Sequence, residues 1–328
     1  MSYTWDYLQH NQKQVKRLLG IDYEQLSQLI AQAKLLDEQH QEKNDKLKVR
    51  LIKRGGGAAR KLSLESEIVL TLIYLRHHTS FQLLALQFQV SESKAHSTFN
   101  YWQSIFRKGL PPSLLEQVKK WETEEEEVDK IREKLTESEL IVDSAEQLIE
   151  RPSDYNEQKS HYSGKKKNHT FKNQFIVLPK GEDIVDVVVG YPGPKSDIKI
   201  CRERLVKFEK KQKFSGDKAY VGEAQITTPY KKPKQGELTA QQKEENKLLS
   251  SDRIFVEHLI RLIKIFKIAQ ERFRLQKSRY QEVIMTVCGL VRLRKGSLRL
   301  EVIKEASSGK TIEIITTHSF GCKLPTLT

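Results

Sequence analysis

The sequence is poor in cysteine and has no long apolar run, and both shortages narrow the class of protein. Within its 328 residues no uninterrupted apolar stretch approaches the roughly 18 residues that a bilayer-spanning helix needs. The first residues, MSYTWDYLQHNQKQVK, lack the apolar core of a signal peptide. Cys201, Cys288 and Cys322 have neither the even count of a disulfide framework nor a zinc-ligand spacing. We therefore expect a cytoplasmic protein.

Two common enzyme signatures are also missing. The run KRGGGAARK is not a nucleotide-binding P-loop, because Arg60 stands where a second glycine is required and no Gly-Lys-Ser/Thr follows. We predict a flexible basic connector there. His77 and His78 lack the HExxH spacing of a zinc site, so we expect both to be surface residues.

Positive charge, by contrast, is abundant and unevenly placed. The chain has 57 basic and 43 acidic residues, a formal net charge of +14, which favours a polyanionic partner. Without a membrane-spanning run, nucleic acid is a better candidate than a membrane. Residues 264–299 are strongly basic, whereas residues 121–139 are strongly acidic. The acidic run is typical of a solvated linker or spacer helix between two domains.

The N-terminal part is predicted to be helical throughout. Helical spacing indicates one or two helices within residues 5–51, followed after the glycines by helices in SEIVLTLIYLR, FQLLALQF and SESKAHSTFNYWQSIFRK. Ser63 and Ser66 are candidate N-caps for the first of these three.

The junction QFQVSESK has the pattern of a helix-turn-helix. A tight turn at Val90 precedes a helix capped by Ser91, and the start of that helix carries Ser93, Lys94 and His96. Such a helix can enter the major groove and present its first residues to base edges. An ordinary three-helix bundle is the alternative.

After Glu139 the pattern becomes mixed. The predicted strands are SELIVDS, HTFKNQFIVLP, EDIVDVVVGYPG, KFSGDKAY and ITTPY, and the predicted helices are DIKICRERLVKFEKK, the helix around residues 250–267 and a final one. A three-strand meander followed by alternating helices and strands describes an RNase H-like α/β fold. We therefore predict a mixed-sheet catalytic domain preceded by an all-α helix-turn-helix domain.

Two acids would meet at the centre of this sheet. Asp143 on the first strand and Asp217 on the fourth would lie side by side. Phosphodiester hydrolysis uses hard cations held by carboxylates, and two such ions about 4 Å apart can activate the attacking oxygen and stabilise the leaving one. Other acids in this half stay open as candidates: Asp183, Asp186, Asp197, Glu146 and Glu150.

One acid also stands in a basic stripe of the helix around residues 250–267. Arg253, Glu257, Arg261 and Lys264 fall within about 80° of one another on a helix. The stripe is either a solvated face with i,i+4 ion pairs or a DNA-backbone contact in which Glu257 closes a metal site.

At these residues the chain resembles the Asp-Asp-Glu (DDE) transposases of bacterial insertion sequences, in the branch related to Harbinger transposases. IVDSAEQLIERP, HYSGKKKNHTFKNQ and GDKAY are similar to family motifs, and Arg253, Glu257 and Lys264 fit the spacing of a further one. Ser250 replaces the tyrosine of that motif, and the sequence beyond about residue 303 no longer resembles the family.

The resemblance implies a transposase that binds terminal inverted repeats, cleaves the strand at the element's end and joins the 3′-hydroxyl to target DNA. Asp143, Asp217 and Glu257 would be catalytic ligands of two Mg²⁺ or Mn²⁺ ions. We also expect self-association on double-stranded DNA and association with the bacterial nucleoid. The alternatives are a catalytically inactive DNA-binding derivative and an endonuclease without strand transfer.

Phosphate contacts are predicted for Lys165, Lys166 and Lys167, for which a solvated lysine turn is the alternative. The predicted domains are N-terminal helices with a glycine linker, a helix-turn-helix domain, an acidic linker, the catalytic domain and a divergent tail, at residues 1–60, 61–112, 113–138, 139–300 and 301–328.

Overall fold

The computed structural model of the chain describes residues 3–47, 61–120, 125–298 and 300. Nearly all of the predicted glycine connector, the first part of the acidic run and the divergent tail lie outside the described residues. No helix among the described residues is long and apolar enough to cross a membrane.

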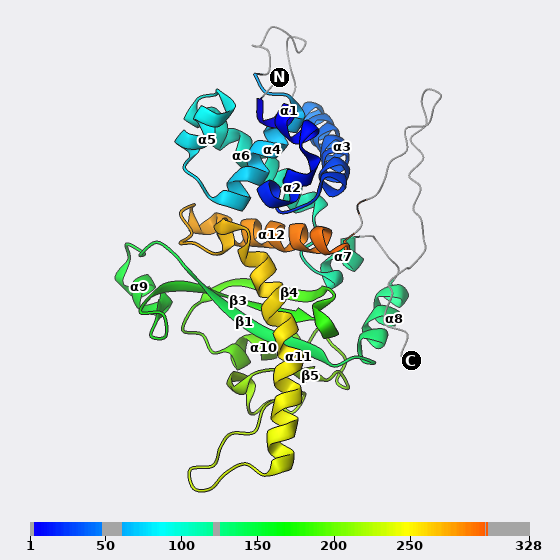
Figure 1. Ribbon diagram of the computed structural model, residues 1–328, viewed down its shortest axis with the longest axis vertical. Coiled ribbons are helices and arrows are strands. Elements are labelled where there is room, and N and C mark those ends of the chain that lie inside the picture. Colours follow the sequence, from blue (N-terminus) through cyan, green and yellow to red (C-terminus); the bar gives the residue numbers. More distant parts are fainter. Residues whose placement is uncertain (1–2, 48–60, 121–124, 299, 301–328) are drawn as a thin grey trace.

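A layer of helices forms the N-terminal part, as Figure 1 shows. Its members are α1 (Tyr3–His10), α2 (Gln12–Leu19), α3 (Tyr23–Leu47), α4 (Leu64–His77), α5 (Phe81–Phe88) and α6 (Glu92–Gly109). The stretch before the glycine run thus contains three helices, more than the one or two predicted, because Gly20 ends α2 in the left-handed conformation with φ 87°.

The helix-turn-helix is confirmed in its local chemistry. The turn between α5 and α6 contains Gln89 at φ 55°, and the Ser91 hydroxyl accepts a hydrogen bond from the Lys94 N–H at 3.2 Å. Ser63 caps α4 as expected, but the prediction for Ser66 is wrong. Ser66 lies buried in the first turn, where its N–H donates to the Ser63 hydroxyl.

A mixed sheet follows. It contains β1 (Leu140–Leu148), β2 (Tyr162–Ser163), β3 (Asn168–Val177), β4 (Ile184–Pro192), β5 (Phe214–Ser215) and β6 (Ile226–Thr227). The central order is β4-β3-β1-β5-β6, with β3 antiparallel to β1 and β4, and with β5 and β6 parallel to β1. This arrangement is the RNase H-like mixed sheet that the sequence predicts.

Helices cover both faces of the sheet (Figure 1). Alternate residues of β1 point to opposite faces, so Val142 packs with residues of α10 (Asp197–Leu205), and Ile141 packs in the core that α11 (Ala240–Lys264) and α12 (Tyr280–Lys295) share. The shorter elements are α7 (Leu114–Lys120), α8 (Glu125–Leu135), α9 (Tyr155–His161), η1 (Pro179–Gly181), η2 (Lys218–Tyr220), η3 (Lys267–Ala269) and η4 (Lys277–Arg279).

Helix α12 lies between the helical layer and the sheet (Figure 1), and it packs against both α6 and β4. Its buried Arg292 binds Asp183 through two hydrogen bonds of 2.7 Å, and it also donates to the Pro111 carbonyl and to Gln117. One continuous apolar core therefore includes residues of the helical layer, α12 and the sheet.

The prediction that both histidines after α4 are surface residues is wrong for His78. His77 is exposed, but His78 is only 2% exposed. His78 ends α4 in the left-handed conformation, and its side chain contacts Glu271 and Arg274, which lie between η3 and α12. Because the chain reverses direction at His78, the imidazole lies buried where the helical layer contacts the segment between η3 and α12.

Candidate functional site

The first two acids of the site are placed by neighbouring parallel strands. Ile141 of β1 lies opposite Ser215, the last residue of β5, and Asp143 and Asp217 each follow two residues after this pair. Asp217 thus lies not on the strand, where the sequence predicts it, but just after it, as the N-cap of η2. Each carboxylate uses one oxygen to accept a backbone hydrogen bond of 2.8 Å, Asp143 from Ser144 and Asp217 from Ala219 in η2. Both side chains are partly buried.

The third acid comes from the helix that crosses β1. In α11, Val256, Leu259, Ile260 and Ile263 are buried, whereas Glu257 is exposed. Burial raises the pKa of Asp143 to about 6, and the charges of Asp217 and Glu257 act in the same direction against the Ser144 N–H and Arg253. The structure therefore brings the three carboxylates within electrostatic reach of one another.

Four of the five competing acids already have side-chain partners. Ion pairs join Asp183 to Arg292 at 2.7 Å, Asp186 to Arg204 at 2.6 Å and Asp197 to Lys172 at 3.2 Å, while Glu146 accepts from the Thr170 hydroxyl at 2.9 Å. Glu150 is exposed at the end of β1. By contrast, no described cation forms an ion pair with any of the three carboxylates at the site.

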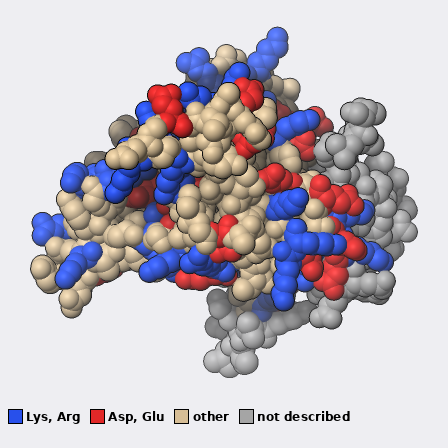
Figure 2. Space-filling model, turned by 90° about the horizontal axis from the view of Figure 1, so that it is seen from below, with Lys and Arg blue, Asp and Glu red and all other residues tan. Residues whose placement is uncertain are grey.

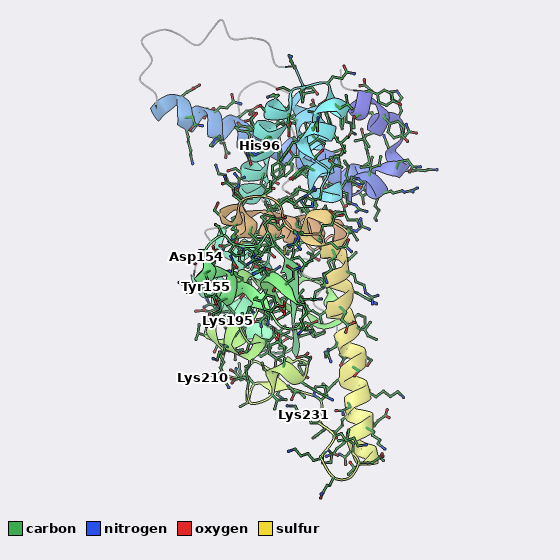
Figure 3. The ribbon with its side chains drawn as sticks, turned by 90° about the vertical axis from the view of Figure 1, so that its left-hand side faces the viewer. His96, Asp154, Tyr155, Lys195, Lys210 and Lys231 are labelled. Atoms are coloured by element: carbon green, nitrogen blue, oxygen red, sulfur yellow. The ribbon has the colours of Figure 1, made fainter. Side chains whose placement is uncertain are left out.

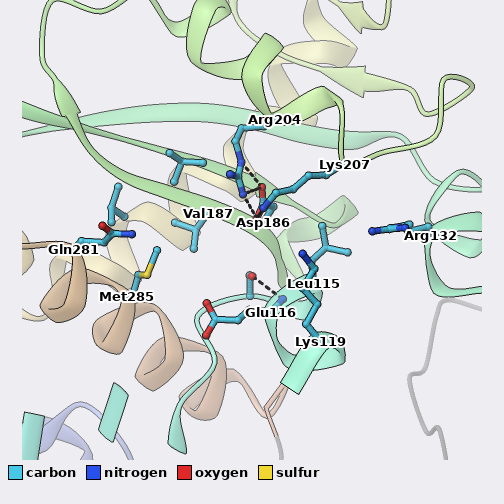
Figure 4. A pocket seen from close by; sticks show the side chains of 13 residues that line it. Leu115, Glu116, Lys119, Arg132, Asp186, Val187, Arg204, Lys207, Gln281 and Met285 are labelled. Carbon is cyan, nitrogen blue, oxygen red and sulfur yellow. Dashed lines mark hydrogen bonds and ion pairs between the residues drawn. The ribbon is translucent and has the colours of Figure 1, made fainter. Parts of the chain in front are cut away.

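A cavity of about 290 Å³ lies beside Asp186, at the strand β4 and the helices α7 and α12 (Figure 4). Its lining includes Leu115, Glu116, Arg204 and Met285, and it contains none of the three carboxylates. The candidate site is therefore an open surface beside α11 and separate from this cavity.

The donor chemistry of the three carboxylates fits a hard divalent cation, since such ions take carboxylate oxygens. The carboxylates of Asp143 and Asp217 each accept one hydrogen bond from a described residue, through Oδ1, and a cation would relieve the like-charge repulsion that helps to raise the pKa of Asp143. Among the described residues, however, no group of three or more acidic, histidine or cysteine side chains lies close enough together to hold a metal ion, so the three carboxylates are neighbours without forming a ready-made ligand set.

The basic stripe of α11 flanks these acids. Arg253 and Lys264 are partly buried, Arg261 is exposed, and Glu257 forms no ion pair with Arg253 or Arg261. The pKa of Lys264 is lowered by burial and by Lys166, against the charge of Asp143. The stripe therefore lacks the i,i+4 ion pairs with Glu257 expected of a solvated face.

The lysine turn connects β2 to β3. Lys165, Lys166 and Lys167 are all exposed, and the Lys166 N–H donates to the Ser163 hydroxyl at 3.3 Å. Because Lys166 acts on Lys264, the structure brings this turn to the basic stripe.

The predicted DNA-reading residues on α6 differ in their surroundings. Ser93 and His96 are exposed, whereas the Lys94 ammonium donates to the buried Glu67 at 2.9 Å. Glu67 also accepts from the indole of buried Trp102 at 2.9 Å. The Lys94 ammonium is thus partly held by a carboxylate of the helical core.

One feature beside the site was not predicted. The hydroxyls of Ser144 and Tyr220 lie 3.0 Å apart, and the Gln174 amide donates to Tyr220 at 3.1 Å. Burial raises the pKa of Tyr220, so this phenol stays a neutral hydrogen-bonding group. The network ties the residue after Asp143 to the turn after Asp217. In the sequence, the only hint of this network was a tyrosine three residues after Asp217.

We expect the substitution Asp143→Asn to stabilise the metal-free protein at neutral pH. A folded pKa of about 6 lies above the ordinary 3.8, so this group's contribution to stability is present below about pH 4 and is lost as the pH rises towards 6. The variant should gain up to about 3 kcal/mol at pH 7.5, or roughly 6 to 12 °C in Tm, and only about 0.5 kcal/mol at pH 4. Added Mg²⁺ should raise the Tm of the wild type more than that of the variant.

Thermal unfolding at the two pH values measures this effect, with the exposed Glu150→Gln as the matched control. A variant that is less stable than the wild type at pH 7.5 would contradict the placement of Asp143 among like charges.

Comparison with known proteins identifies the class in the same two segments. Residues 142–292 match the family of DDE superfamily endonucleases, and residues 60–112 match the helix-turn-helix of DDE superfamily endonucleases. A probable transposase for insertion sequence element IS702 from Microchaete diplosiphon is 31% identical over 235 residues, which cover 70% of this chain and 79% of that protein. The chain therefore belongs to the DDE superfamily endonucleases, as a transposase with a helix-turn-helix.

Two solved structures are also similar, both 12% identical in sequence. The match to the Mos1 transposase paired-end complex with left transposon end covers 74% of this chain and 79% of the Mos1 chain, with a TM-score of 0.23. A pre-cleavage Mos1 transpososome covers 75% and 80%, with a TM-score of 0.22. TM-scores this low carry no conclusion about a shared three-dimensional arrangement.

Proposed function

We propose that the protein binds the terminal inverted repeats of its own element, cleaves the strand at each end and joins the freed 3′-hydroxyl to target DNA. The observation that carries this proposal is the grouping of Asp143, Asp217 and Glu257: burial and the charges of the other two acids raise the pKa of Asp143, and none of the three forms an ion pair with a described cation. Asp183, Asp186 and Asp197 nearby each pair with a basic side chain, unlike the three acids of the site.

In this proposal Asp143, Asp217 and Glu257 would hold two Mg²⁺ or Mn²⁺ ions, which activate water and stabilise the leaving oxygen when bound. The water oxygen forms a bond to phosphorus while the bond to the 3′-oxygen breaks, and that oxygen takes up a proton. The 3′-hydroxyl then attacks a target phosphodiester, so one P–O bond forms as another breaks. Arg253, Arg261 and Lys264 would hold the DNA backbone during both displacements.

Residues 61–112 would bind the repeat, residues 113–138 would act as a spacer and residues 139–300 would carry the chemistry. Ser93 and His96 are exposed where base edges would lie, and Lys94 would be shared between Glu67 and phosphate. We place the chain in the Harbinger-related branch on the motifs described above. Self-association on DNA and a location at the bacterial nucleoid complete the proposal.

Cleavage and strand transfer on a duplex that carries the element's own terminal repeat test this function. The expected result is Mg²⁺-dependent nicking at the repeat and joining of the new 3′ end to a second duplex. Specific binding without cleavage would favour an inactive DNA-binding derivative, and cleavage without joining would favour an endonuclease.

The lysine turn gives a second test. Counterion release makes log K fall with log salt by about 0.9 per phosphate neutralised. Replacing Lys165, Lys166 and Lys167 with Gln should reduce this slope by up to about 3 and weaken binding at low salt. An unchanged slope in a filter-binding or anisotropy titration would leave these side chains as a solvated turn.

A further inference from the structure

The sheet domain has basic side chains besides the phosphate contacts already proposed for Lys166 and Lys264. Figure 2 shows lysine and arginine spread widely over one face of the molecule, with acids interspersed, so charge alone does not define a path. The contacts of six basic residues do define one: Arg274, Arg272, Arg151, Lys277, Lys166 and Lys264. We refer to these six as the basic track.

One end of the basic track lies against the helix-turn-helix. Arg274 is exposed and donates to the His78 carbonyl at the end of α4. Tyr74, one turn earlier on α4, stacks on Phe81 with ring centroids 4.3 Å apart, and Phe81 meets the ring of His96 edge-on at 4.9 Å. A single aromatic cluster thus separates Arg274 from the exposed start of α6, which Figure 3 shows above the α9 segment.

The middle of the basic track lies at the end of β1. The Arg272 guanidinium donates to the Ile149 carbonyl at 2.6 Å, and the Ile149 N–H donates to the His169 carbonyl at 3.0 Å. The pKa of His169 is lowered by burial and by Arg151, His161, Arg272 and Lys277. Four positively charged or titratable groups from three chain segments therefore act on one imidazole.

The far end reaches the carboxylates. His169 follows the lysine turn by two residues, Lys166 of that turn acts on Lys264, and Lys264 lies near Asp143. Along β1, Ile149 is six residues from Asp143, or about 20 Å at the rise of an extended strand.

Little of this positive charge is neutralised within the protein. Glu157 pairs with Lys277 at 2.6 Å, and Glu271 pairs with His78. Arg151 donates to the neutral Gln158, and Arg272 donates to a backbone carbonyl. Clustered cations of this kind suit a polyanion better than an isolated anion, because each added phosphate relieves repulsion between neighbours.

We infer that the basic track binds the phosphate backbone of the DNA segment that lies between the sequence read by the helix-turn-helix and the cleavage point. This inference rests on the proposed function and names the path of its substrate.

The test compares Arg151→Gln/Lys277→Gln with Lys199→Gln/Lys210→Gln, an equal loss of charge at exposed lysines on the α10 side of the sheet. Binding is measured without divalent metal on a short duplex that holds only the helix-turn-helix sequence and on a longer one that extends past the cleavage point. On the longer duplex the track variant should bind about tenfold more weakly, with a salt slope smaller by about 2. On the short duplex it should equal the wild type.

The control pair should change neither affinity. An equal loss on both duplexes, or no loss on the longer one, would overturn the inference. A Tm close to that of the wild type shows that the track variant is folded, as expected since surface ion pairs contribute little to stability. Because the readout is binding, a protein that never cleaves DNA would refute the proposed function and still leave the track testable.

Discussion

Glu257→Gln should lower the rates of cleavage and strand transfer by about 10²-fold or more while DNA binding is roughly kept. A carboxylate that holds a catalytic cation contributes several kcal/mol to the transition state, and each 1.4 kcal/mol is about tenfold in rate. The amide is nearly isosteric and Glu257 is exposed, so the fold should be unaffected. Single-turnover cleavage of a labelled terminal-repeat duplex measures the effect.

Glu244→Gln is the matched control for this substitution. Glu244 lies on the same helix, three turns and more before Glu257, and is also exposed. Its replacement should leave both rates unchanged. If the wild type cleaves and Glu257→Gln cleaves equally well, Glu257 is a surface residue and the site must recruit another acid.

Arg292→Met should destabilise the whole described fold by about 3–5 kcal/mol, which corresponds to a fall in Tm of roughly 6 to 20 °C. Arg292 is 1% exposed and Asp183 is 7% exposed, so the substitution leaves a buried carboxylate without its cation. The Pro111 carbonyl and Gln117 lose their donor as well. Thermal and urea unfolding measure the loss.

A second substitution separates the charge from the packing. Arg292→Met/Asp183→Asn buries no unpaired charge and should recover a large part of the stability. Arg202→Ala is the control, because it removes a solvent-exposed ion pair with Glu223 and should cost at most about 1 kcal/mol. Equal losses for Arg292→Met and Arg202→Ala would show that the buried network contributes nothing special.

Local patterns predicted the fold well. The three helices that include the helix-turn-helix, the antiparallel meander and the parallel strands after it each have their own periodicity and caps, so residues close in sequence decide them. Capping by Ser63 and Ser91 is an example. The same reasoning failed for Ser66, because a helix has a single N-cap residue and Ser63 occupies that position. It failed for His78 because a tertiary contact buries the imidazole, and no local pattern contains that contact.

The candidate site could be predicted only in part from the sequence. Spacing predicted Asp143 and Asp217 on neighbouring strands, but it could not separate them from Asp183 and Asp186, whose arginine partners lie 109 and 18 residues away in the chain. The network of Tyr220 was missed for the same reason. Hydrogen-bond and ion-pair partners that are distant in sequence are brought together by tertiary packing, which local sequence patterns do not predict.

The position of α12 has a consequence for how such proteins diversify. Its buried side chains contribute to one core with both the helical layer and the sheet, so neither part presents a surface that a foreign partner would fit without repacking. We expect that lineages acquire new end sequences through substitutions at exposed positions of α6, such as Ser93 and His96, and that transplanting an N-terminal segment from a distant relative yields insoluble chains.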